Sequence, residues 1–284
     1  MERECCLAML VTLIGGAALL ACGWWPAANL EACGARRAEK VAWRRIWMPA
    51  APALAIAAAL CGWALVEPDP VPEKVPWSLA LMTIPFALLF ARTALRGAAA
   101  LLAIQDDPAI ATVGLLRPWI VFSPKLAKGL SDRQIEAALE HERAHMRHRD
   151  PLRIWLAQFA ADLQWPWPQA RERLDAWLVA LELARDEETR AAGIDGADLA
   201  EAILASARFA GRTNLAMQAA LAGKPSRLKE RIQRLLDPPP SDSQKSEPSS
   251  YGLLLLLAPA FALALVSGAL FGERLVRALF WIAA

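Results

Sequence analysis

Histidine is scarce in this 284-residue chain, which has only three, and tyrosine occurs once, as Tyr251. The histidines, His141, His145 and His148, all lie within eight consecutive positions. A histidine-based metal site can therefore form only in this segment, and a further ligand from elsewhere has to be a carboxylate. The same scarcity leaves few histidine or tyrosine side chains that could donate a hydrogen bond to an oxyanion at such a site.

The chain also has few cysteines and a small net charge. The five cysteines lie within residues 5–61, their number is odd and none forms a C-x-x-C pair, so the sequence does not predict a disulfide framework. The long segment 92–250 has no cysteine, which fits a reducing compartment. The net charge of +2 is too small to indicate nucleic-acid binding.

Apolar residues are abundant and gather in four runs, residues 5–25, 46–66, 75–91 and 251–272. A transmembrane helix needs about 20 apolar residues, so we expect four membrane spans. The third run is shorter and contains Pro85, and a buried or re-entrant segment is the alternative for it. Residues 1–4 carry no positive excess, which favours an uncleaved span over a secretion signal for the first run.

The loops between these runs differ in charge. The first loop holds five basic residues against two acidic ones, and the second, residues 67–74, holds three acidic residues and one lysine. The positive-inside rule then places the first loop and segment 92–250 in the cytoplasm, and both termini outside.

Segment 97–236 has the signals of a small α+β domain. Apolar and polar residues alternate over 109–123, and Gly114 and Pro118 interrupt the pattern, which predicts two short strands. An S-x-x-Q capping box at Ser131 predicts a helix over 132–149, and Asp150, as a capping residue before a proline, predicts another over 150–164. Further helices are expected over 169–191, 196–208 and 225–236.

The expected organisation is therefore a mainly α membrane protein in five parts. These are a three-helix membrane region (1–96), the α+β domain (97–236), a polar Pro/Ser linker (237–250), a fourth transmembrane helix (251–272) and a short external tail (273–284). The basic helix over 224–234 is expected to be solvated and partly membrane-facing, with binding of nucleic acid or anionic lipid as the alternative.

Residues 141–145 read H-E-x-x-H on a predicted helix. Positions i and i+4 share a helix face, so His141 and His145 can reach one zinc ion. Glu142 projects about 100° round the helix, close enough to contact water at the metal. The alternative is an ordinary histidine pair on an amphipathic helix.

A catalytic zinc site needs a third protein ligand. His148 lies two turns beyond His141, about 10 Å along the axis, and fits poorly. Glu182 and Asp186 are four residues apart, so Glu182 could bind zinc while Asp186 accepts the N–H of a ligating histidine. A solvated acidic face is the alternative, and spacing alone does not separate the two.

Residues 112–151, followed by E-x-x-x-D at 182–186, resemble the BlaR/MecR-type membrane metallopeptidases, the transducers of β-lactam-sensing systems. Zinc proteases of the HtpX and CAAX-prenyl-protease type share the H-E-x-x-H and E-x-x-x-D motifs. The resemblance implies a zincin-like domain in which zinc is bound by His141, His145 and Glu182 and Glu142 is the general base. It gives Asp186 and Asp150 supporting roles behind the ligands, and His148 is the remaining histidine for a transition-state donor.

Two departures from that family stand out. Trp167-Pro168 replaces the Asn-Pro that often precedes the third-ligand helix. After the fourth run only residues 273–284 follow, so we expect no extracellular penicillin-binding sensor domain.

The resemblance implies a zinc endopeptidase of the bacterial cytoplasmic membrane that cleaves a cytoplasmic regulatory protein, such as a transcriptional repressor. A quality-control protease of the HtpX type and a non-catalytic zinc-bearing receptor or scaffold are the alternatives. The expected partners are a protein substrate and the lipid bilayer but not nucleic acid, and a homo-oligomer is left open.

Overall fold

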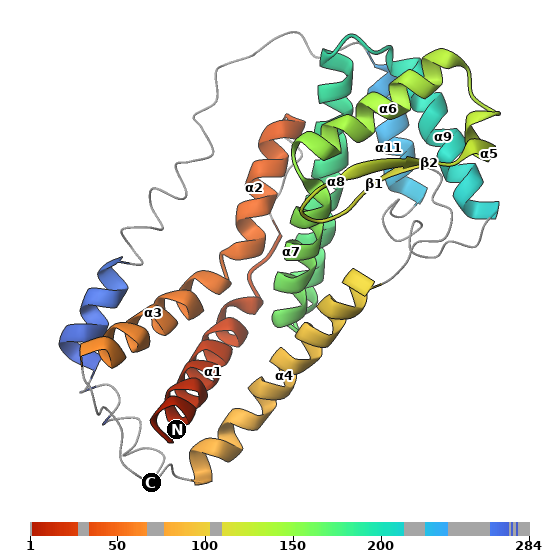
Figure 1. Cartoon of the computed structure of the whole chain (residues 1–284). Coiled ribbons are helices and arrows are strands. Elements are labelled where there is room, and N and C mark those ends of the chain that lie inside the picture. The colour runs from red at the N-terminus through yellow and green to blue at the C-terminus, as the bar shows by residue number, and fades with distance from the viewer. Residues whose placement is uncertain are drawn as a thin grey trace.

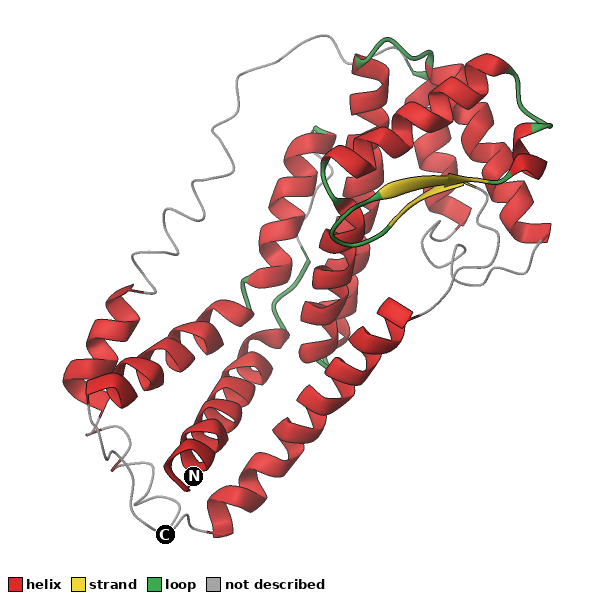
Figure 2. Ribbon diagram, viewed as in Figure 1, coloured by secondary structure: helices red, strands yellow, loops and turns green. Residues whose placement is uncertain are grey.

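The computed structural model describes residues 2–27, 34–66, 77–102, 110–212, 225–237 and 262–272, together with residues 274 and 277. Over these residues the chain is mainly helical, with one two-stranded sheet (Figure 2). The mainly α expectation is confirmed there. The linker from residue 238 onward, Tyr251 and most of the external tail lie outside the described residues.

Two helices are long and apolar enough to cross a membrane. They are α1 (Glu2–Gly23) and α4 (Trp77–Leu102), with candidate spans at Cys5–Gly23 and Trp77–Leu101. Both run toward the end of the molecule where the other helices gather (Figure 1). The first and third expected spans are therefore confirmed as candidates by length and composition.

The second expected span is bent. Most of the run 46–66 forms the apolar helix α3 (Ala50–Val66), which is 17 residues long. The basic helix α2 (Ala35–Trp47) precedes it and holds only the first two residues of the run, and the axes of the two helices differ by 47°. Pro49 lies in the break, where its missing N–H interrupts the helical hydrogen bonds. The pair counts as a third span only if both helices are taken together.

The fourth expected span is described only in part. Its described portion is the apolar helix Ala262–Gly272, which is shorter than a full span. It packs closely on α3, because Gly62 and Gly268 have no side chains at the contact and the backbones can approach. The prediction of four spans thus becomes two or three candidates among the described residues.

The segment after α4 begins with a hairpin. Strands β1 (Ile110–Val113) and β2 (Trp119–Phe122) pair antiparallel, as expected. Gly114 turns the chain after β1 with φ of +92°, a conformation that glycine adopts without strain. The hairpin packs against α6 (Figure 1).

Helices form the rest of this segment, and most begin and end near the expected residues. They are α5 (Pro124–Ala127), α6 (Asp132–Arg147), α7 (Asp150–Leu163), α8 (Pro168–Ala191), α9 (Gly196–Arg212) and α11 (Pro225–Leu236). Both bonds of the expected capping box are present at the start of α6. The short helix α5 was not expected.

The core of this bundle includes α2, which precedes the bundle by some distance in the sequence. Ala42 and Ile46 of α2 pack with Trp177, which is fully buried on α8, and with alanines of α7. Helix α2 therefore lies on the same side of the candidate spans as the bundle (Figure 1). That this side is the cytoplasm stays a prediction.

Candidate metal centre

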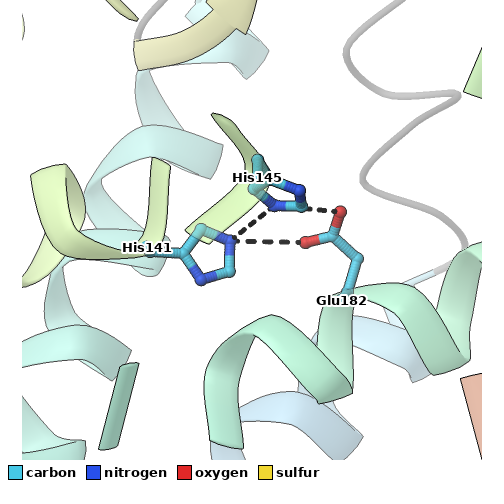
Figure 3. A group of neighbouring side chains, drawn as sticks. All are labelled: His141, His145 and Glu182. Atoms are coloured by element: carbon cyan, nitrogen blue, oxygen red, sulfur yellow. Dashed lines mark hydrogen bonds and ion pairs between the residues drawn. The ribbon is translucent and has the colours of Figure 1, made fainter. Parts of the chain in front are cut away.

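Two helices bring three metal-binding side chains together. His141 and His145 lie one turn apart on α6, and Glu182 faces them from α8 (Figure 3). The Nε2 atoms of the histidines are 3.1 Å apart, and each lies within 3.8 Å of a Glu182 carboxylate oxygen. Both histidines are buried. The expected ligand set thus forms one group that could hold a metal ion.

The far side of each imidazole ring faces a carboxylate. His145 Nδ1 lies 2.8 Å from an oxygen of Asp150, and His141 Nδ1 lies 3.2 Å from Asp186, although too far off line for a good hydrogen bond. Both carboxylates favour a proton on Nδ1, so both Nε2 atoms are left as lone-pair donors.

Two unprotonated imidazole nitrogens 3.1 Å apart repel each other, and a cation near both atoms, either a proton on one ring or a metal ion, removes this repulsion. Two imidazole nitrogens and a carboxylate are a donor set that zinc prefers. The residues therefore fit a zinc ion, and the contacts behind the rings hold them in the required orientation.

The electrostatics of the group also favour a cation. Burial would lower the pKa of His141, but its contacts with Asp186 and Glu182 raise this pKa to about 10. Burial would raise the pKa of Glu182, yet Arg231 and the two histidines hold it well below its usual range. The carboxylates are thus ionised around the histidines, where they would stabilise a bound metal ion.

Glu142 is held by a side chain of the hairpin. The Thr112 hydroxyl on β1 lies 2.7 Å from Glu142 Oε2 and 2.9 Å from the Glu142 backbone oxygen. A hydroxyl has one proton to donate, and an ionised carboxylate is the stronger acceptor. Thr112 therefore orients Glu142, and the sequence analysis did not identify it.

Asp150 does not cap α7 as the sequence suggested. The capping position is Arg149, with φ of +52°, and it makes no side-chain cap. Asp150 is fully buried and accepts hydrogen bonds from Arg185 and Arg153, at 2.6 Å and 3.0 Å at closest. Charged donors and His145 bind this carboxylate more strongly than the backbone N–H groups of a helix start would.

The buried charges continue from Asp150 into α2. Arg153 lies 2.5 Å from a carboxylate oxygen of Glu39, and Arg185 lies 3.7 Å from the same atom. Burial would raise the pKa of Asp150, but His145 and Arg185 hold it well below its usual range. A continuous set of ion pairs therefore joins the helix after the first span to a candidate metal ligand.

Arg231 of α11 is a residue of this site that the sequence analysis missed. It makes two 2.9 Å hydrogen bonds to the Asp186 carboxylate and lies 2.9 Å from Glu182 Oε2. Its side chain is only 13% exposed. The expectation that this basic helix is solvated and membrane-facing is wrong at this position, because the carboxylates of α8 neutralise the guanidinium.

A signal for Arg231 was present in the sequence. On α11 it precedes Ile232 and lies four residues before Leu235, which is buried against α6 and α9. A charged residue beside an apolar helix face needs a buried partner, but sequence position alone does not indicate which acidic residue that partner is.

The remaining acidic and histidine residues lie around the group rather than in it. His148 is exposed and its Nε2 lies 2.8 Å from Glu188, so among the described residues it is not part of the metal-binding group. Its role as a transition-state donor stays a prediction. Glu187 accepts a hydrogen bond from the first amide of α2. The acidic face of α8 is thus engaged in contacts, contrary to the alternative of a solvated face.

Comparison with known proteins identifies one family. Residues 101–235 match the family model described as BlaR1 peptidase M56. No curated protein and no solved structure matches the chain. The matched segment includes both histidines on α6, the carboxylates of α8 and Arg231 of α11. The chain therefore carries a metallopeptidase domain of the BlaR1 M56 family, with His141, His145 and Glu182 as its candidate metal-binding group.

Proposed function

We propose that this protein is an integral-membrane, zinc-dependent endopeptidase that cleaves a cytoplasmic regulatory protein, for example a transcriptional repressor. The observation that carries the proposal is the grouping of His141, His145 and Glu182 within an M56 domain that is joined to membrane-spanning helices. The regulatory substrate is inferred from the resemblance to sensor transducers.

In this proposal His141, His145 and Glu182 hold the zinc ion. When bound, zinc would supply Lewis acidity, which makes water nucleophilic near neutral pH and polarises a peptide carbonyl. Glu142 takes a proton from the attacking water and later delivers it to the leaving amine. Asp150 and Asp186 hold the Nδ1 sides of the two histidines, so that their Nε2 atoms stay available.

The charge of α2 supports a cytoplasmic site. This helix carries the basic residues Arg36, Arg37, Lys40, Arg44 and Arg45. It packs along α8, which carries Glu182. Since basic loops are retained in the cytoplasm, the metal-binding group would face the same compartment.

The test is a comparison of new protein N-termini in cells that express the wild type or Glu142→Gln at matched levels. Glu136→Gln is the matched control, because Glu136 is exposed on the same helix. A few soluble cytoplasmic proteins cut by the wild type and the control, but not by Glu142→Gln, would support the proposal.

Other outcomes would contradict it. Fragments of many membrane proteins would instead indicate quality control of the HtpX type. Identical N-termini in all three strains under every stress tested, with zinc retained by the purified proteins, would indicate a non-catalytic receptor or scaffold.

A further inference from the structure

The turn between α7 and α8, residues 164–167, lies against the ends of the candidate spans. Arg173, just inside α8, donates hydrogen bonds to the backbone oxygens of Gly23, at 3.0 Å, and Trp25. A side chain at Gly23 would collide with the Trp167 ring. The turn therefore packs where α1 ends.

The turn and the end of α7 also contact α4. The Arg92 guanidinium lies 5.2 Å from the centre of a Trp165 ring. Near the end of α7, Asp162 pairs with Arg96 at 3.3 Å. The turn is thus level with the first charged residues of α4, as well as with the end of α1.

This level matches the expected position of one membrane surface. The candidate span of α1 stops at Gly23. In α4, Arg92 and Arg96 follow Trp77 by about 22 Å and 29 Å along the helix axis, close to the hydrocarbon thickness of about 30 Å. Charged side chains and tryptophans gather at this boundary.

Four exposed tryptophans lie at the same level. The exposed fractions are 55% for Trp24, 37% for Trp25, 55% for Trp165 and 38% for Trp167. An exposed indole is costly in water but favourable among lipid headgroups, where its apolar ring is buried and its N–H can be hydrated. Two of the four belong to the peptidase domain and not to a span.

We propose that the α7–α8 turn is an interfacial anchor, with Trp165 and Trp167 entering the headgroup region of the bilayer that α1 and α4 cross. The partner is the lipid surface itself. The anchor does not depend on catalysis, and it would fix the start of α8, and hence the distance of Glu182 from the bilayer.

The test uses spin labels on the full-length protein in vesicles of phosphatidylethanolamine and phosphatidylglycerol, with the native cysteines replaced. Labels are attached at Trp165→Cys or Trp167→Cys. The matched control is Ala191→Cys, which is exposed at the other end of α8, about 35 Å along the axis. Collision rates with oxygen and with a water-soluble nickel chelate give the depth of each label.

We expect both turn labels to collide more often with oxygen, and less often with the nickel chelate, than the control label does. Turn labels with the same two collision rates as the Ala191→Cys label would overturn the proposal. Retained zinc binding of each labelled variant shows that the domain is folded.

A second measurement covers the case in which cysteine at the turn prevents folding. Tryptophan emission is compared between the wild type and the Trp165→Phe, Trp167→Phe double variant in vesicles of brominated lipid. The wild-type emission minus that of the double variant is the emission of Trp165 and Trp167. We expect brominated lipid to quench it as strongly as the emission of Trp24 and Trp25, which is obtained in the same way from a Trp24→Phe, Trp25→Phe double variant. If the emission of Trp165 and Trp167 is not quenched while that of Trp24 and Trp25 is, the turn does not enter the bilayer and the proposal is wrong.

Discussion

At the scale of single residues, the arrangement of Glu142 depends on a side chain from another element. Its Oε2 atom is 2.7 Å from the Thr112 hydroxyl, so the plane of the carboxylate is restrained by the hairpin. A hydrogen bond to a charged group stabilises by about 1.5–3 kcal/mol. Loss of this bond would let the carboxylate rotate away from the position in which it can accept a proton from water.

We therefore expect Thr112→Val to lower kcat/KM about 10- to 150-fold, which is what 1.5–3 kcal/mol corresponds to, with zinc binding unchanged. Valine has the shape of threonine but lacks the hydroxyl, and it is well tolerated in strands. The rate is measured on the substrate found by the comparison of N-termini.

Two controls separate positioning from folding. Thr112→Ser keeps the hydroxyl and should restore most of the activity. Thr83→Val removes a different hydroxyl, which bonds to the Leu79 carbonyl in α4, and should have little effect. Equal activities of the Ser and Val variants at position 112 would contradict the role given to Thr112.

At the scale of elements, α11 is joined to α8 by the Arg231 guanidinium, which neutralises two buried or half-buried carboxylates at once. Breaking a buried ion pair by removing one partner costs about 3–5 kcal/mol, because the remaining charges stay desolvated. The attachment of α11 to α8 is therefore sensitive to this one side chain.

We expect Arg231→Met to increase the hydrogen-exchange rate of the α11 amides, while the amides of α7 keep theirs. Methionine preserves most of the side-chain length and removes only the charge and the donors. Arg234→Met is the matched control, since the Arg234 side chain is 46% exposed and pairs with Glu230 one turn away on the same helix. Equal exchange in the two variants would show that the ion pairs do not hold α11.

The elements also show what could and could not be predicted from the sequence. The capping box at Ser131 and the spacing of His141 and His145 are local patterns, and both are confirmed. The bend at Pro49 and the packing of α2 on α8 depend on contacts between distant segments, so the apolar run alone suggested one straight span. Arg231 was missed for the same reason, because its partners lie on another helix.

At the scale of the whole molecule, the metal-binding group joins α6 to α8, two helices of the domain core. A ligand that binds only the folded protein stabilises it by about 2.7 kcal/mol at a concentration 100 times its dissociation constant. We therefore expect zinc to raise the melting temperature of the chelator-treated protein by about 5–10 °C, measured in detergent.

The zinc-dependent change in melting temperature, compared between variants, distinguishes the zinc ligands from the proposed base. Glu142→Gln should show the same zinc-dependent shift as the wild type, because Glu142 is outside the three-residue group. His145→Ala should lose the shift. A full shift in His145→Ala would mean that zinc binds elsewhere.

The helix α8 also sets a minimum reach for any substrate that is itself anchored in the membrane. Glu182 follows Pro168, which starts the helix beside the ends of the spans, by about 21 Å along the axis. With the α7–α8 turn at the bilayer surface, as proposed above, and α8 along the membrane normal, roughly six extended residues of about 3.3–3.6 Å each would have to separate that surface from the bond to be cut. A membrane-anchored protein whose folded soluble domain starts fewer residues than this from the bilayer would not be cleaved, because its chain could not reach the site. This selection would need no preference for a particular sequence.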